Sequence, residues 1–230
     1  MKLLNSLNDA QAEAVKYNSK PHMIVAGAGS GKTRALTYKV AYIIEQEGYE
    51  PSTILALTFT NKAANEMKER IIKLVGKKAA DMWIGTFHSI FARILRKEAA
   101  KLNYDPNFSI YDKEDSVTLV NHLLNEYNIS IDGWTANSIH HKISYLKNTM
   151  VEPQDFLENI ASTAAERKIG QIYTEYNKHL FANNAMDFDD LLLKPIKLFQ
   201  TNEKVLRHYR KQFKYILVDE FQDTNRPQYE

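Results

Sequence analysis

The sequence predicts an α/β protein in which a parallel sheet is flanked by helices and carries an inserted all-helical subdomain. Short apolar runs alternate with helical patterns over about the first 110 residues, and one more such run stands near the C-terminus. A glycine-rich segment joins the first run to a helix. From about residue 113 to 185 the pattern is helical, with almost no strand signal. Strands that alternate with helices form parallel sheets that are covered on both faces.

The composition is that of a globular protein, with 230 residues of which 44% are hydrophobic and 25% are charged. No stretch approaches the roughly 20 apolar residues of a membrane span, and the N-terminus has no apolar core of signal-peptide length. We therefore expect no membrane association and a cytoplasmic location. The absence of cysteine excludes disulfides and thiolate metal sites, and we expect no structural metal. A net charge of +2 does not by itself indicate a nucleic-acid partner.

The first elements are a helix, a strand and a second helix. Asn8 or Asp9 is expected to cap the first helix, because both residue types accept hydrogen bonds from a helix N-terminus. Residues 23–25 form a short apolar run that is expected to be a buried strand. The helix that follows the glycine-rich loop is expected to end at Gly48 and Pro51.

The glycine-rich loop has the composition and the context of a phosphate-binding loop. Its glycines lack Cβ atoms, so backbone N–H groups can turn towards phosphate oxygens. Lys32 would reach the β- and γ-phosphates, and the Thr33 hydroxyl would ligate Mg²⁺. Ala26 stands where the general pattern has glycine, and the simpler alternative is a turn that caps a helix. We expect the whole loop to bind nucleotide: Ala26, Gly27, Ala28, Gly29, Ser30, Gly31, Lys32 and Thr33.

Two further strand–helix pairs follow the loop. Residues 54–59 are expected to be a buried strand, which leads into a helix capped at Thr60-Asn61 and ended by Gly76. Residues 82–86 are expected to be a third strand, followed by a helix. After the helical stretch, residues 186–192 are expected to begin another helix with an acidic first turn.

The last expected strand, residues 215–218, carries an acidic stretch at its C-terminal end. In an open parallel sheet, ligands bind outside the carboxyl ends of the strands. Asp219 can therefore reach the Mg²⁺ that Thr33 would hold, and Glu220 can orient or deprotonate an attacking water. The alternative is an acidic loop after a core strand, and the presence of a phosphate-binding loop in the same chain favours the nucleotide site.

Together these motifs resemble those of superfamily 1 DNA helicases of the UvrD/PcrA/Rep family, and the resemblance covers the whole chain. The stretches that carry it are Leu7-Asn8-x-x-Gln11, the loop 26–33, Thr58 to Ala64, Gly85 to Ser89, and Asp219-Glu220-Phe221-Gln222-Asp223. In this family alanine is usual at the first loop position. The resemblance implies a RecA-like P-loop NTPase fold, with ATP and Mg²⁺ as cofactors.

The resemblance also implies roles for single residues. Gln11 would read the adenine edge, and Arg34 would approach the base. Thr33 and Asp219 would hold Mg²⁺, while Lys32, Asp219, Glu220 and Gln222 would be catalytic. The residues implied to contact DNA are Phe59, Thr60, Asn61, Lys62, Thr86, Phe87 and His88. Without the resemblance, an aromatic residue at a strand end is more often part of the core, His88 is more often a capping residue, and Arg34 is equally often solvated.

By the same resemblance, residues 1–110 and 186–230 would form the ATP-binding domain 1A, and residues 111–185 the inserted helical subdomain 1B. The implied activity is 3′-to-5′ translocation on single-stranded DNA and unwinding at single-strand/duplex junctions, in repair or replication. A second RecA-like domain would be a required partner. We expect this chain alone to be poorly active, with an exposed sheet edge, and residue 230 not to be the natural end.

Three other functions remain open at this stage. The chain could bind nucleotide or DNA without turnover, or it could be the helicase part of a helicase–nuclease. A metabolic kinase is the least favoured, because Gln11, the stretch after residue 58 and the acidic stretch would then all be coincidences.

Overall fold

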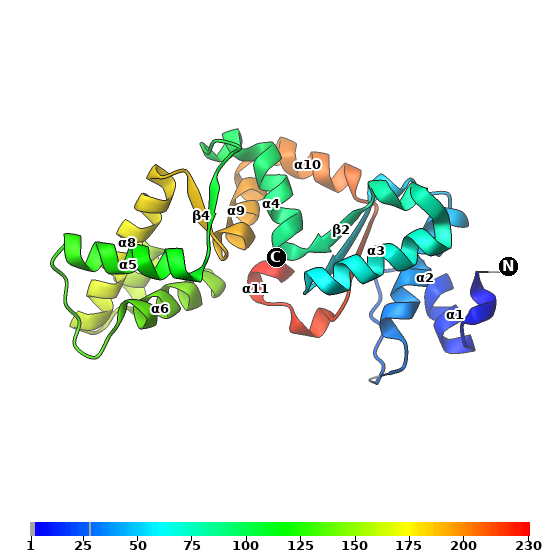
Figure 1. The fold of residues 1–230 in the computed structure, drawn as a ribbon, viewed down its shortest axis with the longest axis horizontal. Coiled ribbons are helices and arrows are strands. Elements are labelled where there is room, and N and C mark those ends of the chain that lie inside the picture. Colours follow the sequence, from blue (N-terminus) through cyan, green and yellow to red (C-terminus); the bar gives the residue numbers. More distant parts are fainter. Residues whose placement is uncertain (1–2, 28) are drawn as a thin grey trace. The chain divides into compact units, whose positions relative to one another are not determined.

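A computed structural model describes residues 3–27 and 29–230. Ala28, one of the residues predicted to bind nucleotide, lies outside the described residues. The chain divides into two compact units (Figure 1). The first contains Met1–Ile90 and Leu206–Asp223, and the second contains Phe91–Val205 and Thr224–Glu230. The C-terminal segment therefore contributes to both units.

The first unit contains a parallel sheet, as the sequence predicts, and the sheet has three strands. Its strands are β1 (Ile54–Thr58), β2 (Trp83–Thr86) and β5 (Tyr215–Val218), in the order β2-β1-β5. All five residues of the central strand β1 are buried, as is typical of a parallel strand with a neighbour on each side. The register places Leu57 opposite both Gly85 and Val218. The carboxyl ends of the three strands thus meet at one edge of the sheet.

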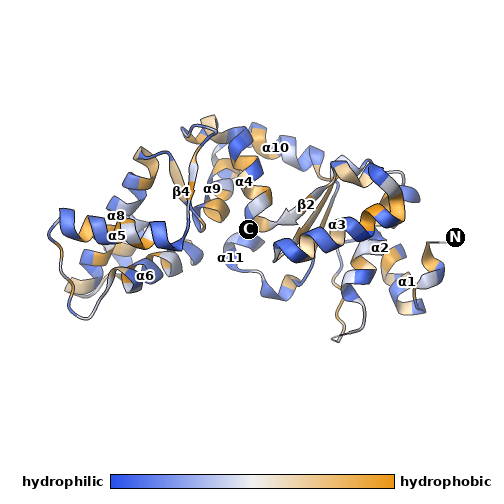
Figure 2. Cartoon of the chain, viewed as in Figure 1, coloured by the Kyte–Doolittle hydropathy of each residue, from blue (hydrophilic) through white to orange (hydrophobic). Residues whose placement is uncertain are grey.

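Helices α1 (Asp9–Lys16), α2 (Lys32–Glu45) and α3 (Asn61–Val75) belong to this unit, with short 3₁₀ turns at Leu4–Ser6, Pro51–Thr53, Gly76–Asp81 and Phe221–Asp223. Asn8 caps α1 and Thr60 caps α3, as predicted. Helix α2 packs against α1 and α3, and Figure 2 shows hydrophobic and hydrophilic residues alternating around α3. The core between helices and sheet includes Val40, Ile43, Ile54, Met67 and Ile71.

The predicted strand at residues 23–25 is wrong. This run has no regular secondary structure, and Met23 and Val25 are 68% and 83% exposed. Strand β5 is an edge strand whose Ile216 is 62% exposed, and among the described residues no strand pairs with its outer side. A strand is held by hydrogen bonds to a neighbour, and an apolar run without such a neighbour does not form one.

The predicted helix at residues 186–192 also needs correction. Residues Ala185–Asp187 form strand β4, which pairs in parallel with β3 (Ser109–Tyr111), and helix α9 begins only at Asp190. All three residues of β4 are buried. Pairing with a strand distant in the sequence overrides the local helical pattern here.

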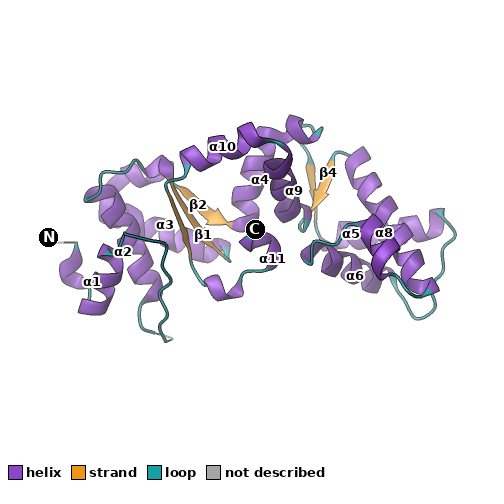
Figure 3. Cartoon of the chain, turned by 180° about the vertical axis from the view of Figure 1, so that it is seen from behind, coloured by secondary structure: helices purple, strands orange, loops and turns teal. Residues whose placement is uncertain are grey.

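The second unit is mainly helical, as predicted (Figure 3). Its helices are α5 (Lys113–Glu126), α6 (Ala136–Asn148), α7 (Pro153–Asp155), α8 (Ala164–Ala182), α9 (Asp190–Thr201) and α11 (Arg226–Tyr229), with a π-helical turn at Phe156–Ile160 and a 3₁₀ turn at Ala99–Leu102. Its largest core cluster includes Leu123, Ile139, Ile143, Ile169 and Tyr173. None of the helices in the described part of the chain is long and apolar enough to cross a membrane.

The two units divide inside two helices and in one loop. One division lies in α4 (Phe87–Glu98), and another lies in α10 (Glu203–Gln212). The third falls between Asp223 and Thr224, directly after the acidic stretch. The predicted division into residues 1–110, 111–185 and 186–230 remains a prediction.

Candidate nucleotide site

The glycine-rich loop adopts backbone conformations that favour glycine. Gly29 and Gly31 have φ angles of +75° and +85°, in the left-handed region that side chains with a Cβ rarely adopt. A Cβ on Gly31 would also lie 2.7 Å from Gln11 Nε2. Ser30 closes the turn, because its hydroxyl donates to Gly27 O over 2.7 Å. The loop therefore ends at the N-terminus of α2, where unpaired N–H groups favour anions.

Lys32 lies across this loop. Its Nζ donates to Ala26 O over 3.0 Å and to Gly27 O over 3.3 Å. Because an ammonium group has three donors, it can keep a loop contact and still bind an anion seated above the loop. The contact of Lys32 with a phosphate remains a prediction.

The two predicted metal ligands come together, although they are 186 positions apart. Thr33 Oγ1 donates to Asp219 Oδ2 over 3.3 Å. The backbone N–H of Asp219 donates to Leu57 O over 2.9 Å, which fixes this residue at the carboxyl end of β5. Burial raises the pKa of Asp219 and the charge of Glu220 raises it further, while the hydrogen bond from Thr33 opposes the shift. A cation at this point would favour the ionised carboxylate.

Thr33 and Asp219 fit a site for Mg²⁺ rather than a metal site whose ligands all come from the protein. Within the described residues, no group of three or more histidine, aspartate or glutamate side chains is arranged to hold a metal. Mg²⁺ commonly takes one or two protein oxygens and completes its shell with water and substrate phosphates. The hydroxyl of Thr33 and the carboxylate of Asp219 supply such oxygens.

Glu220 and Gln222 follow in a tight turn. Glu220 has a φ angle of +51°, which is unusual for a residue other than glycine. The turn is closed by Asp223 N, which donates to Glu220 O over 3.0 Å. Gln222 Nε2 donates to the Glu220 carboxylate. The Glu220 side chain is exposed, so water can reach the predicted catalytic base.

Gln11 is the third helical residue of α1, where it completes a capping box with Asn8. Its Nε2 donates to Ser30 O over 2.8 Å, so the amide is held against the phosphate loop. A cavity of about 480 Å³ lies beside it, with Gln11, Tyr17, His22, Ser30 and Lys32 among its lining residues. An amide that faces a cavity next to a phosphate loop suits the edge of a nucleobase.

The Arg34 side chain is bonded to Ser6 and does not line this cavity. Its Nη2 donates to Ser6 O over 2.6 Å, and its guanidinium lies 5.6 Å from the centre of the Tyr38 ring. It is not among the residues that line the cavity. Its contact with the base remains a prediction.

The residues predicted to contact DNA gather at the carboxyl ends of β1 and β2. The rings of Phe59 and Phe87 lie 5.7 Å apart at an angle of 58°. Phe87 is only 3% exposed, whereas Phe59 is partly exposed and is followed by the exposed Thr60, Asn61 and Lys62. Phe87 therefore packs as a core residue beneath this surface.

Two of these predicted DNA contacts also have structural roles. Thr60 Oγ1 accepts a hydrogen bond from Ala63 N, and Thr86 Oγ1 accepts one from Ser89 N. Both threonines thus bond to the first turn of the helix that follows. His88 is partly buried in the first turn of α4.

A family model for the UvrD/REP helicase N-terminal domain matches residues 7–230. The chain belongs to this family. It is 44% identical over 227 residues to a protein of Bacillus subtilis (strain 168) named ATP-dependent DNA helicase PcrA, an alignment that covers 99% of this chain and 31% of the relative. A PcrA of Staphylococcus aureus (strain Mu50) is 43% identical over 227 residues, with the same coverage.

A third relative is ATP-dependent DNA helicase UvrD1 of Mycobacterium bovis, which is 43% identical over 230 residues, covering 99% of this chain and 30% of the relative. The chain thus spans about 31% of the length of these two PcrA relatives. The family membership agrees with the resemblance inferred from the motifs.

Sequence reasoning missed Lys39, which holds α1 against α2. Its Nζ is buried and donates to Val15 O and Tyr17 O over 3.0 and 2.6 Å. Burial lowers the pKa of Lys39, and the charge of Glu47 opposes the shift. The signal was a lysine beside the buried residue Val40 of α2. Without this contact, the C-terminal end of the helix that carries Gln11 would have two unpaired carbonyls.

Proposed function

We propose that this chain is the ATP-binding, N-terminal part of an ATP-dependent DNA helicase that moves 3′ to 5′ on single-stranded DNA in the cytoplasm. The observation that carries the proposal is the hydrogen bond between Thr33 and Asp219. It brings the phosphate loop and the acidic stretch to one point at the carboxyl edge of the sheet, which is where nucleotides bind in open parallel sheets. The relatives named above as ATP-dependent DNA helicases support the same activity.

Different residues of this chain bind the phosphates, hold the metal ion and accept the proton during ATP hydrolysis. Backbone N–H groups of the loop and Lys32 bind the phosphates. Thr33 and Asp219 would hold Mg²⁺, and the ion would supply positive charge to the phosphate oxygens. Glu220 accepts a proton from the attacking water, and Gln222 keeps the Glu220 carboxylate oriented through the contact between their side chains.

Single-stranded DNA would lie along the carboxyl ends of β1 and β2. There Phe59 offers a partly exposed ring, supported from below by Phe87. Asn61 and Lys62 offer an amide and a cation beside it. Exposed aromatic rings next to polar and cationic groups suit stacked bases and phosphates. Asp219 follows β5 at the same carboxyl edge of the sheet, so a shift of the DNA can be transmitted to the acidic stretch.

The test is ATP hydrolysis at the protein's full natural length, with and without single-stranded DNA. We expect DNA to stimulate turnover in the unaltered protein. Glu220→Gln should lower kcat by about 10²–10⁴-fold, the usual contribution of a general base, while leaving ATP binding in place. Glu69→Gln makes the same chemical change at an exposed position of α3 and should have no effect. The proposal would be overturned if single-stranded DNA did not stimulate hydrolysis, or if Glu220→Gln left kcat unchanged.

A further inference from the structure

The segment that follows the acidic stretch is fixed by a side chain from the helical unit. Asn225 caps α11, because its Oδ1 accepts from Gln228 N over 3.0 Å. Its Nδ2 donates to Asn148 Oδ1 over 2.8 Å. Asn148 is the last residue of α6 and lies 77 positions earlier in the chain. The first residues after the acidic stretch are therefore held by α6.

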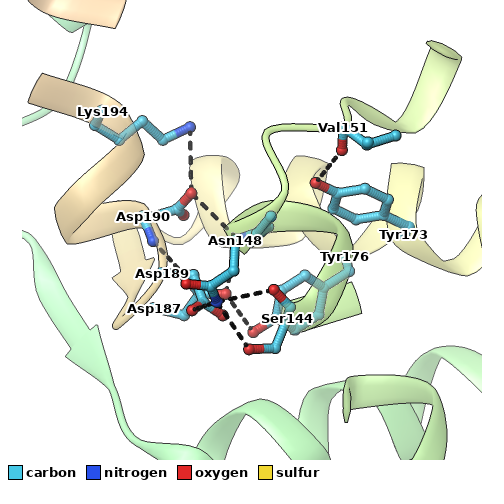
Figure 4. A network of polar contacts seen from close by, with 10 residues as sticks. Ser144, Asn148, Val151, Tyr173, Tyr176, Asp187, Asp189, Asp190 and Lys194 are labelled. Atoms are coloured by element: carbon cyan, nitrogen blue, oxygen red, sulfur yellow. Dashed lines mark hydrogen bonds and ion pairs between the residues drawn. The ribbon is translucent and has the colours of Figure 1, made fainter. Parts of the chain in front are cut away.

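Asn148 is also hydrogen-bonded to Asp189 (Figure 4). Its Nδ2 donates to Asp189 Oδ1 over 2.7 Å and to Ser144 O over 2.9 Å. The three side chains form a row with one direction, in which each amide donates to the next oxygen and the Asp189 carboxylate accepts last. We call Asn225, Asn148 and Asp189 the amide row.

Residues close in sequence to the amide row form a buried ionic cluster. Lys147, next to Asn148, contacts Asp187 Oδ2 at 2.7 Å and Asp190 Oδ1 at 3.1 Å, and its side chain is 1% exposed. Asp187 and Asp190 flank Asp189 in the sequence. Helix α11 packs against α9, and Pro227 is buried. A row supported in this way on both sides has little freedom to move.

The acidic stretch is thus held at both ends. At its start, Asp219 N continues the hydrogen bonding between β5 and β1. At its end, Asn225 belongs to the amide row, two residues after Asp223. The division between the compact units falls at this point, between Asp223 and Thr224, whereas the other two divisions fall inside helices. Between the two fixed ends, Glu220 has its unusual positive φ angle.

We propose that the amide row positions Glu220 and Gln222 for hydrolysis by fixing the chain directly after the acidic stretch. Asn148, Asp189 and Asn225 are then positioning residues, because they would act on hydrolysis through Glu220 and Gln222. This inference rests on the proposed ATP hydrolysis. Small displacements of a catalytic group cost large factors in rate, so loosening one end of the stretch should affect turnover more than binding.

The direction of the hydrogen bonds gives a sharp test at the full natural length. Asn225→Asp keeps the acceptor that caps α11 but loses the donor, and its carboxylate then faces Asn148 Oδ1. Rotating the Asn148 amide does not help, because its oxygen would then face the Asp189 carboxylate. The double variant Asn225→Asp with Asp189→Asn reverses the row at the same net charge. An Asn148 with a rotated amide then bonds to both exchanged ends and loses only its bond to Ser144 O.

We expect Asn225→Asp to lower kcat for DNA-stimulated ATP hydrolysis by about 10- to 100-fold with little change in KM for ATP. Hydrogen exchange should become faster in residues 219–225, and the unfolding midpoint should stay the same. The double variant should recover most of the lost kcat and the protection from exchange. Asn159→Asp is the matched control, because Asn159 donates to Asp155 in an exposed pair of the same unit.

Three outcomes would overturn the inference while leaving the proposed function intact. They are an unchanged kcat in Asn225→Asp, a loss of kcat that the double variant does not reverse, and a loss matched by a lower unfolding midpoint. If the unaltered protein shows no DNA-stimulated hydrolysis, the proposed function fails, and this inference fails with it.

Discussion

The substitution Lys147→Met would remove a buried cation that lies between two buried carboxylates. The side chains of Lys147, Asp187 and Asp190 are 1%, 4% and 6% exposed. Burial by itself disfavours the ammonium, but the charges of Asp187 and Asp190 outweigh it, and the pKa of Lys147 is raised well above its usual value. Methionine has a similar length and fills the space, so the change removes mainly the charge.

The expected cost follows from the charges left behind. Removing one partner of a buried ion pair typically costs about 3–5 kcal/mol, because the remaining charge has neither water nor a counter-ion. Lys194 Nζ lies 3.8 Å from Asp190 Oδ1 and relieves part of this cost, while Tyr176 OH still donates to Asp187. We therefore expect a loss near the lower end, about 3 kcal/mol. At about 2–4 °C per kcal/mol for a chain of this size, the unfolding midpoint would fall by about 6–12 °C.

The assay is urea and thermal unfolding of this chain, followed by circular dichroism. Lys178→Met is the matched control, because Lys178 forms an exposed ion pair with Glu175 on α8, and exposed pairs contribute little. Lys147→Met combined with Asp187→Asn should recover part of the loss, since one of the two unpaired charges is then gone. If Lys147→Met shifts the midpoint no more than Lys178→Met does, the reasoning from buried charge is wrong.

Three further predictions concern other parts of the chain. Gly31→Ala should weaken nucleotide binding, because alanine disfavours the φ angle of +85° and its Cβ would meet Gln11; calorimetric titration with ATP checks this, with Gly48→Ala as a second glycine of positive φ away from the loop. Glu166 accepts hydrogen bonds from the backbone N–H groups of Thr163 and Ser162, which lower its pKa to about 2. A lowered carboxyl pKa stabilises the folded state above the unfolded value and loses that effect as the pH falls towards 2, so acid titration of stability should be shallower in Glu166→Gln, and an unchanged curve would contradict the assignment. Ile216→Lys should reduce self-association of this chain, because a cation on an open strand edge opposes pairing with another edge; sedimentation at several concentrations measures it, and equal association of both proteins would count against an edge contact.

The sequence by itself determined the elements that depend on residues close together in the chain. Asn8 and Thr60 cap the helices that they were expected to cap, because a capping side chain bonds to a residue only two or three positions away. The glycine-rich loop and the acidic stretch were also recognised, since each motif is continuous in the sequence. Strands β1, β2 and β5 were predicted for the same reason, as mainly apolar runs of strand length.

The tertiary structure decided what depends on distant partners. Residues 23–25 are an apolar run that forms no strand, whereas residues 185–187, with an aspartate, do form one. The second run pairs with β3, and no described strand pairs with the first. Strand formation depends on a neighbour that the run itself does not contain.

The polar contacts show the same division. Nothing in the sequence distinguishes Lys147 from an exposed lysine of a helix. Its burial depends on the carboxylates of Asp187 and Asp190, which lie 40 and 43 positions away. The contacts of Thr33 with Asp219 and of Asn225 with Asn148 likewise join distant segments. A single sequence states which groups can pair, but the packing of the sheet and helices determines which of them meet, because burial and distance are properties of the folded chain.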